Sequence, residues 1–287
     1  MVKLLAERAC AKINLFLRVT GRRADGYHEL DSVFLPITLA DEIRLEIRTA
    51  PESSIAIDCN IPALTAAGDD LATRAARAFI AEFELVAQVR INLTKHIPIG
   101  AGLGGGSSDA GSVLRMMASA ARIGDDGADR LHRIALALGA DVPFFLDPAP
   151  SRVTGIGERL APLADVPKMP IVVAAPPFEV ATARIFRALE PSGWSGPAPD
   201  ADVSAILRGE ISPSLVVNDL AAVAIAQFPE IGRIKVLLEE LGARAAQMSG
   251  SGGAVFGVFS TQSAADRAAE QARQRIPDAM IVSASTV

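Results

Sequence analysis

The sequence has few of the residues that mark several common protein classes. Among its 287 residues are only 2 cysteines, Cys10 and Cys59, which are too few for a framework of disulfide bonds. Its 3 histidines are scattered, and no cysteine–histidine cluster with metal-ligand spacing exists, so a structural zinc site is not expected. Aromatic residues make up only 5% of the chain, which argues against a row of base-stacking side chains.

Long apolar runs and an excess of positive charge are absent as well. No stretch approaches the roughly 20 apolar residues of a membrane span. The first ten residues lack the apolar core of a signal peptide, because Glu7 and Arg8 interrupt them. The 28 lysines and arginines face 33 acidic residues without a basic block, which disfavours a nucleic-acid partner. A hydrophobic fraction of 50% with 21% charged residues is typical of a globular protein, and we expect a cytoplasmic one.

The hydrophobic patterns predict an α+β fold with mostly antiparallel pairing. Strands are expected at residues 9–19, 32–39, 42–48, 55–58, 89–94, 171–175, 244–248, 254–259 and 280–283, with a hairpin at 152–163. Helices are expected at 70–83, 107–123, 128–138, 182–189, 215–227, 231–241 and 263–275. Gly139 is expected to end the helix before it in the left-handed conformation. Prolines at 147–150 favour a boundary there, which divides the chain into domains 1–150 and 151–287.

The strongest motif lies at residues 98–109, where five glycines stand between a predicted strand and a predicted helix. Glycine lets backbone amides approach a ligand, and the helix N-terminus adds a positive dipole end, so the motif suits a phosphate group. Ser107 and Ser108 are expected to cap the helix or to bind a phosphate or its magnesium ion. The alternative is a mobile linker that ends in a capped helix, but the position between two elements favours an anion site.

The kind of anion follows from what surrounds this glycine-rich motif. The pattern of a standard P-loop, with its lysine, is not present. Gly100, Gly102 and Gly105 match the spacing of a dinucleotide-binding turn, but no strand ending in an acidic residue follows at the required distance. The context therefore favours a nucleoside triphosphate over NAD.

Two further motifs near the start of the chain each have two interpretations. Lys12 and Asn14 are two apart on a predicted strand, so their side chains project together. Taken alone, this pair is expected to belong to a solvated strand face. Tyr27 and His28 follow the turn signal Asp25-Gly26, and such a pair is more often structural than ligand-binding.

Two motifs later in the chain are also ambiguous by themselves. Asp141 is the single carboxylate in the apolar run 139–146, where it would either cap a short helical turn or serve as a base beside a phosphate. Residues 249–253, Ser-Gly-Ser-Gly-Gly, would form either a wide hairpin turn or a second backbone surface over a ligand. No Gly-x-Ser-x-Gly motif supports a serine hydrolase.

In this order the motifs resemble the GHMP kinase superfamily, in which residues 98–109 correspond to the phosphate loop and 249–253 to the late glycine-rich motif. The blocks 11–17, 21–30, 139–143 and 155–158 are similar, more narrowly, to members that act in the non-mevalonate (MEP) route of isoprene and terpenoid biosynthesis. The similarity runs essentially from end to end. Ala101 stands where glycine is also common, a small departure.

The resemblance implies a two-domain fold, in which residues 1–150 form a nucleotide-binding half like the second domain of ribosomal protein S5 and 151–287 a ferredoxin-like substrate half. It implies ATP-dependent phosphorylation of the 2-hydroxyl of a cytidyl-diphosphate sugar alcohol, with ATP and Mg²⁺ as cofactors and the number of subunits left open. Homoserine or mevalonate kinase activity, and a non-catalytic dinucleotide-binding module, are the alternatives.

The resemblance also implies residue roles. Asp141 would accept the proton of the substrate hydroxyl, Lys12 would hold that hydroxyl and the transferring phosphoryl group, and Asn14 would help to position the acceptor. The residues implied in binding the cytidyl substrate are Tyr27, His28, Thr182 and Phe186. The residues implied in binding ATP are Pro98, Ile99, Gly100, Ala101, Gly102, Leu103, Gly104, Gly105, Gly106, Ser107 and Ser108.

Overall fold

The computed structural model describes residues 2–66 and 68–287; Met1 and Ala67, which belong to the first predicted domain, lie outside the described residues. The chain divides into two compact units. Unit 1 takes in the chain up to Ala11 together with Ala40–Ile97 and Gly104–Pro148. Unit 2 comprises Lys12–Leu39, Pro98–Leu103 and Ala149–Val287. The division into domains 1–150 and 151–287 stays a prediction.

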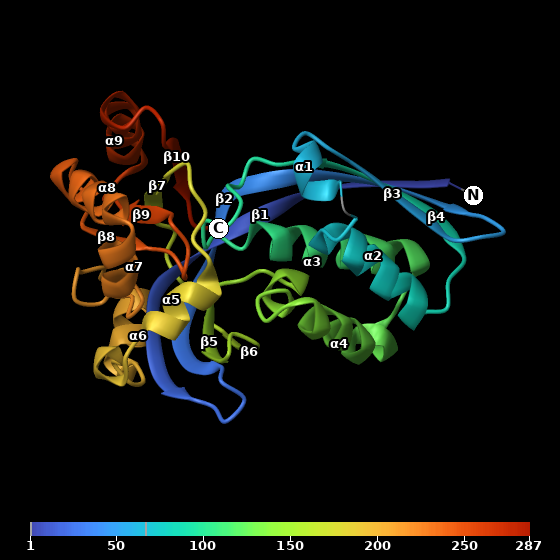
Figure 1. Cartoon of the computed structure of the whole chain (residues 1–287), viewed down its shortest axis with the longest axis horizontal. Helices are drawn as coiled ribbons and strands as arrows, with labels where there is room; N and C mark the ends of the chain where they lie inside the picture. Colours follow the sequence, from blue (N-terminus) through green and yellow to red (C-terminus); the bar gives the residue numbers. More distant parts are fainter. Residues whose placement is uncertain (1, 67) are drawn as a thin grey trace. The chain divides into compact units, whose positions relative to one another are not determined.

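Strands and helices are mixed along the chain in groups of varying number (Figure 1). The strands are β1 (Val2–Arg22), β2 (His28–Thr49), β3 (Ser54–Cys59), β4 (Ala87–Thr94), β5 (Ser151–Gly155), β6 (Arg159–Pro162), β7 (Pro170–Ala175), β8 (Ala245–Met248), β9 (Val255–Val258) and β10 (Met280–Ser285). The helices are α1 (Pro62–Thr65), α2 (Leu71–Glu82), α3 (Gly105–Ala121), α4 (Ala128–Leu138), α5 (Thr182–Ala188), α6 (Asp200–Leu207), α7 (Ala221–Gln227), α8 (Pro229–Glu240) and α9 (Gln262–Arg275). Short 3-10 turns are η1 (Asp125–Gly127), η2 (Pro143–Leu146) and η3 (Pro191–Gly193).

Unit 1 is a sheet covered by helices on one side. The part of β2 from Glu42 to Thr49 pairs antiparallel with β4, and β4 pairs parallel with β3. Residues of β4 alternate between buried and exposed, as expected of a strand with one face in a core. Figure 1 shows α2, α3 and α4 on the same side of β3 and β4, and their apolar side chains form one core with the buried face of these strands.

Helix ends in unit 1 test three local predictions. Asp70 caps α2 as predicted, because its Oδ1 accepts a hydrogen bond of 2.8 Å from the Thr73 amide. The predicted serine cap of α3 is wrong: Gly104, at φ 72°, is the N-cap residue and makes no side-chain cap bond. Gly139 is not left-handed either, since its φ of 167° is extended and its carbonyl accepts from the Val142 amide in a tight turn.

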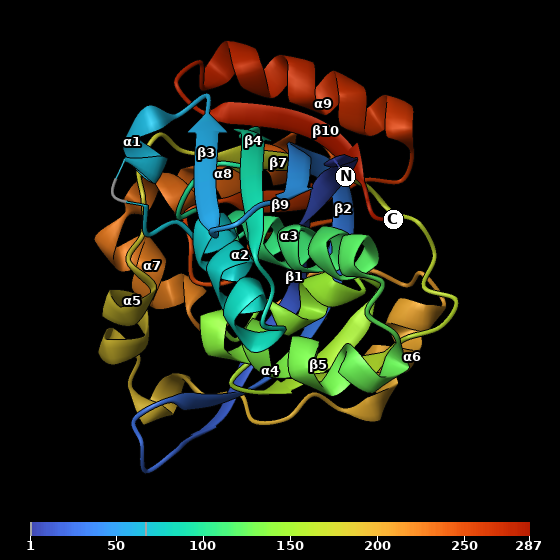
Figure 2. The same cartoon turned by 90° about the vertical axis from the view of Figure 1, so that its right-hand side faces the viewer.

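Unit 2 contains a four-stranded antiparallel sheet in the order β10-β7-β9-β8. Helices α8 and α9 pack against it and share one apolar core with its strands. Figure 2 shows α9 lying along β10. The same unit holds the first part of β2, from Leu30 to Phe34, paired antiparallel with β5, which forms the predicted hairpin with β6.

Most predicted elements are present, but several differ in extent, as β1 does, which was predicted at 9–19 and covers Val2–Arg22. The strands predicted at 32–39 and 42–48 are one strand, β2, because Asp41 between them is fully buried rather than part of a turn. The helix predicted at 215–227 begins only at Ala221, because Asn218 bonds through its side chain to the carbonyls of Met248 and Gly250. Helix α6 was not predicted. No helix in the described part of the chain is long and apolar enough to span a membrane.

Candidate active site

Lys12 and Asn14 lie on β1 and are both 3% exposed, so the expectation of a solvated face is wrong. The strand is buried on both faces from Ala11 to Leu17. Lys12 Nζ donates to Asn14 Oδ1 at 2.6 Å and lies 4.4 Å from the centre of the Phe34 ring. A buried ammonium costs free energy unless partners compensate it, so such a group is a candidate for a functional role.

Asn14 connects this strand to both glycine-rich motifs within unit 2. Its backbone N–H donates to Ser249 Oγ at 3.2 Å, and Ser249 Oγ donates to the Gly102 carbonyl at 3.0 Å. The Lys12 amide donates to the Leu103 carbonyl at 2.9 Å. The residues 249–253 join the antiparallel strands β8 and β9, so the hairpin interpretation is confirmed.

The hairpin 249–253 also packs backbone against backbone on residues 100–103. Gly102 has φ 81°, and a Cβ there would overlap the Ser249 carbonyl oxygen and lie 2.8 Å from the Gly252 amide. A Cβ on Gly252 would overlap the backbone of Ala101 and Gly102. Both positions therefore require glycine, because the backbones of two segments of the chain cross there. The sequence did not predict this contact.

The remainder of the motif at 98–109 opens helix α3 in unit 1. The amides at the start of a helix have no acceptor within it, and the helix dipole is positive there. A Cβ on Gly105 would lie 2.9 Å from Ile97 Cγ2, so glycine is required here by the chain that precedes the motif. Gly106 is exposed and Ser107 half-buried, which leaves the first turn accessible to an anion.

Asp141 lies in unit 1, in the turn between α4 and η2, and is half-buried. Val142 is the N-cap residue of η2 and Asp141 comes just before it, so both interpretations of Asp141, as a cap of this short turn and as a base, stay predictions. The turn that carries Asp141 is fixed by the buried residues after it. Phe145 packs against Gly111 of α3, and the Phe145 carbonyl accepts a hydrogen bond from Arg115.

His28 and Phe186 come together in unit 2, from β2 and α5, with ring centres 5.2 Å apart. The ring of Trp194 stands edge-on to His28 at 5.9 Å and was not predicted, although it is the only tryptophan of the chain. Tyr27, just before β2, is 60% exposed. Burial and the charge of Arg22 lower the pKa of His28, which favours the neutral imidazole at pH 7, a form that can donate one hydrogen bond and accept another.

Thr182 is the first residue of α5 and is exposed. Its Oγ1 lies 2.7 Å from Ser251 Oγ, which brings the start of α5 against the hairpin 249–253 within unit 2. The structure thus joins Thr182, Asn14 and Lys12 to the same pair of glycine-rich segments, although the sequence predicted no such contacts.

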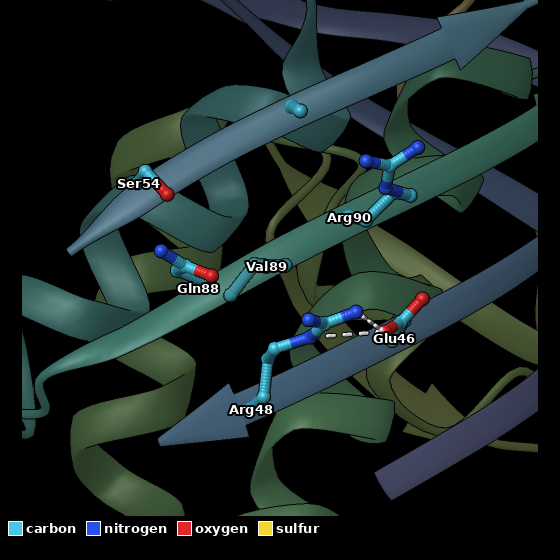
Figure 3. A pocket seen from close by; sticks show the side chains of 7 residues that line it. Glu46, Arg48, Ser54, Gln88, Val89 and Arg90 are labelled. Atoms are coloured by element: carbon cyan, nitrogen blue, oxygen red, sulfur yellow. Dashed lines mark hydrogen bonds and ion pairs between the residues drawn. The ribbon is translucent and has the colours of Figure 1, made fainter. Parts of the chain in front are cut away.

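A hollow on the exposed face of β2, β3 and β4 contains none of the predicted site residues (Figure 3). Its principal charged side chains are Arg48, Arg90 and Glu46, and Arg48 Nε donates to Glu46 Oε1 at 3.1 Å. Among the described residues no group of three or more His, Cys, Asp or Glu is arranged to hold a metal ion.

Comparison with known proteins assigns the family. Residues 70–147 match the GHMP kinases N terminal domain, and residues 205–278 match the GHMP kinases C terminal domain. A protein of Anaeromyxobacter dehalogenans named 4-diphosphocytidyl-2-C-methyl-D-erythritol kinase is 42% identical over 92% of this chain and 84% of its own length. A protein of the same name from Citrifermentans bemidjiense is 38% identical over 94% of this chain and 95% of its own.

The fold agrees with these sequences. A crystal structure of 4-(cytidine 5'-diphospho)-2C-methyl-D-erythritol kinase superposes with a TM-score of 0.83 at 38% identity, over 99% of this chain and 100% of that one. The chain therefore belongs to the GHMP kinases and has their α+β fold. Within them it belongs to the family of 4-diphosphocytidyl-2-C-methyl-D-erythritol kinases, and it is a small-molecule kinase that uses ATP.

Proposed function

We propose that this enzyme transfers the γ-phosphoryl group of ATP to the 2-hydroxyl of 4-diphosphocytidyl-2-C-methyl-D-erythritol, giving the 2-phosphate and ADP in the MEP route. The names of its relatives support this substrate. The observation that carries the proposal is the contact of His28 with Phe186 at 5.2 Å, because adjacent aromatic rings offer a stacking surface for a cytosine ring. Homoserine and mevalonate have no planar ring to stack on such a surface.

ATP binding is assigned to the motif 98–108. The accessible amides of the first turn of α3 suit the β- and γ-phosphates, because they are donors at the positive end of a helix dipole. Mg²⁺ in proteins is bound mainly by water and phosphate oxygens and takes few ligands from the protein, so the half-buried Ser107 hydroxyl is a suitable metal ligand. When bound, the ion neutralises phosphate charge.

Lys12 and Asp141 are assigned the chemistry. Phosphoryl transfer passes through a loose transition state, so alignment and charge neutralisation supply most of the rate. The Lys12 ammonium offsets charge on the phosphoryl group as it leaves ADP, and Asn14, bonded to Lys12 at 2.6 Å, keeps that side chain directed. Asp141 accepts the proton of the acceptor hydroxyl. The proposal requires both groups to reach the same phosphoryl group in the complex with substrates.

The cytidine is assigned to unit 2. Phe186 and the exposed Tyr27 offer stacking surfaces, and the neutral imidazole of His28 bonds to the edge of the base. Thr182, whose hydroxyl is exposed beside Ser251, is assigned to the diphosphate or sugar part of the substrate. The low cysteine content favours a reducing compartment, so we place the reaction in the cytoplasm.

The test is a coupled assay of ADP release with three acceptors: the cytidyl substrate, homoserine and mevalonate. We expect turnover with the cytidyl substrate alone, and turnover confined to another acceptor would refute the substrate. Lys12→Met and Asp141→Asn are each expected to lower kcat by about 10²-fold or more while the Kd of ATP changes little. The matched controls Lys235→Met and Asp58→Asn, both at surface positions, should retain full turnover.

A further inference from the structure

Three ionisable side chains are buried together in unit 1. Asp41 of β2 is 0% exposed, Asp109 of α3 is 3% exposed and Lys95, which follows β4, is 7% exposed. Lys95 Nζ donates to Asp109 Oδ2 at 2.6 Å and also to Asp41 Oδ2. We call these three residues the Lys95 cluster.

Burial of the three ionisable groups of the Lys95 cluster costs desolvation free energy, so the cluster is not an efficient way to stabilise a core. Two carboxylates share one ammonium, and Asp109 Oδ1 is buried without a hydrogen-bond partner among the described residues. Burial and the Asp41 carboxylate raise the pKa of Asp109 to about 7, against the opposite effect of Lys95. Apolar side chains of similar size would commonly fill such a site at no loss of stability, so the cluster calls for a reason other than packing.

The position of the cluster supplies that reason. Asp41 Oδ1 accepts hydrogen bonds from the amides of His96 and Ile97, at 2.5 and 2.8 Å, just before the glycine-rich motif begins. On the far side of the motif, Lys95 Nζ lies 3.3 Å from the point where a Cβ of Gly105 would stand. The cluster therefore bonds to the chain that enters the motif through Asp41 and to helix α3 through Asp109, and Lys95 lies beside the first turn of that helix.

We propose that Lys95, held by Asp41 and Asp109, is a positioning residue for ATP, which sets the place of the first-turn amides of α3 relative to the segment at 96–97. This inference rests on the proposed use of that helix end for the triphosphate. With both carboxylates ionised the cluster carries a net negative charge, so it does not attract phosphate. It acts by geometry, because amides already in place need no reordering when the nucleotide binds.

The test compares Lys95→Met and the milder Asp109→Asn with the unaltered protein. Titration calorimetry with a non-hydrolysable ATP analogue is expected to show a Kd raised about 10-fold in Lys95→Met and about 3-fold in Asp109→Asn. In steady-state kinetics the KM for ATP should rise by similar factors, while the KM for the acceptor and kcat stay within about 2-fold. If Lys95→Met does not fold, Asp109→Asn decides.

The control is Phe79→Leu, a core change in α2 of the same unit that is far from the motif in sequence and fully buried. It should lower the melting temperature and leave the KM for ATP unchanged. The inference is overturned if folded cluster variants bind the analogue as the unaltered protein does, or if their KM and kcat values shift no differently from those of Phe79→Leu. Failure of the unaltered protein to bind the analogue would instead refute the proposed function.

Discussion

Gly111→Ala is expected to disturb the turn that carries Asp141 without touching that residue. Gly111 lies in the middle of α3, where Phe145 of η2 packs directly on its Cα. An added Cβ would stand 2.6 Å from Phe145 Cβ and 2.7 Å from the Phe145 carbonyl oxygen, well inside ordinary van der Waals contact. One of the two elements must therefore move.

The expected magnitude follows from two opposing effects. Overpacking a core costs about 1–3 kcal/mol, and alanine in place of glycine within a helix gains about 1 kcal/mol. The obstructing atoms include backbone of Phe145, which yields less easily than the end of a side chain. We therefore expect a net loss of about 1–2 kcal/mol in the free energy of unfolding. A shift of about 1 Å in the turn would lower kcat by as much as about 10²-fold.

The measurements are urea unfolding and steady-state turnover, with Gly232→Ala as the matched control. Gly232 is also a helical glycine, in α8, but its added Cβ would meet only side-chain carbons of Ile225, the nearest at 3.1 Å. That variant should be neutral or slightly stabilised and fully active. If Gly111→Ala is as stable as the unaltered protein and turns over within about 2-fold of it, the reasoning about this contact is wrong.

Two other expectations concern the hairpin 249–253 and the buried carboxyl group of Asp109. Gly252→Ala forces a methyl group into the backbone at Ala101, so the Kd of an ATP analogue should rise by about 10-fold or more, and an unchanged Kd in calorimetry would contradict the contact. Asp109 has a pKa of about 7 when folded against 3.8 in its ordinary state, so the folded protein binds more protons between these values. The free energy of unfolding should then fall as pH rises through this window, by up to about 4 kcal/mol, and Asp109→Asn should flatten the curve. Urea unfolding at about pH 5 and about pH 8 measures this, and identical slopes for both proteins would refute it.

Local patterns in the sequence predicted the local parts of the site. Five glycines between a strand and a helix predicted the start of α3, and the spacing of Lys12 and Asn14 predicted that their side chains project together. These predictions succeed because strand alternation and glycine conformations depend on neighbouring residues alone. The roles of Lys12 and Asp141 came from the resemblance to GHMP kinases and stay proposals.

What covers each residue was decided only by tertiary structure. The alternation of side chains along β1 is the same whether the face that carries Lys12 is exposed to solvent or buried. The expectation of a solvated pair was therefore wrong. His28 meets Phe186 and Trp194 across more than 150 residues of chain, and Gly252 meets Ala101 across a similar span.

By itself the sequence determined where most helices and strands lie along the chain and which backbone segment is able to present amides to an anion. The tertiary structure decided which charges lose contact with water, and it alone assembled Lys95, Asp41 and Asp109 from three separate segments of the chain. The physical reason is that burial of a charge depends on every segment packed around it, and no periodicity within one segment records what those others are.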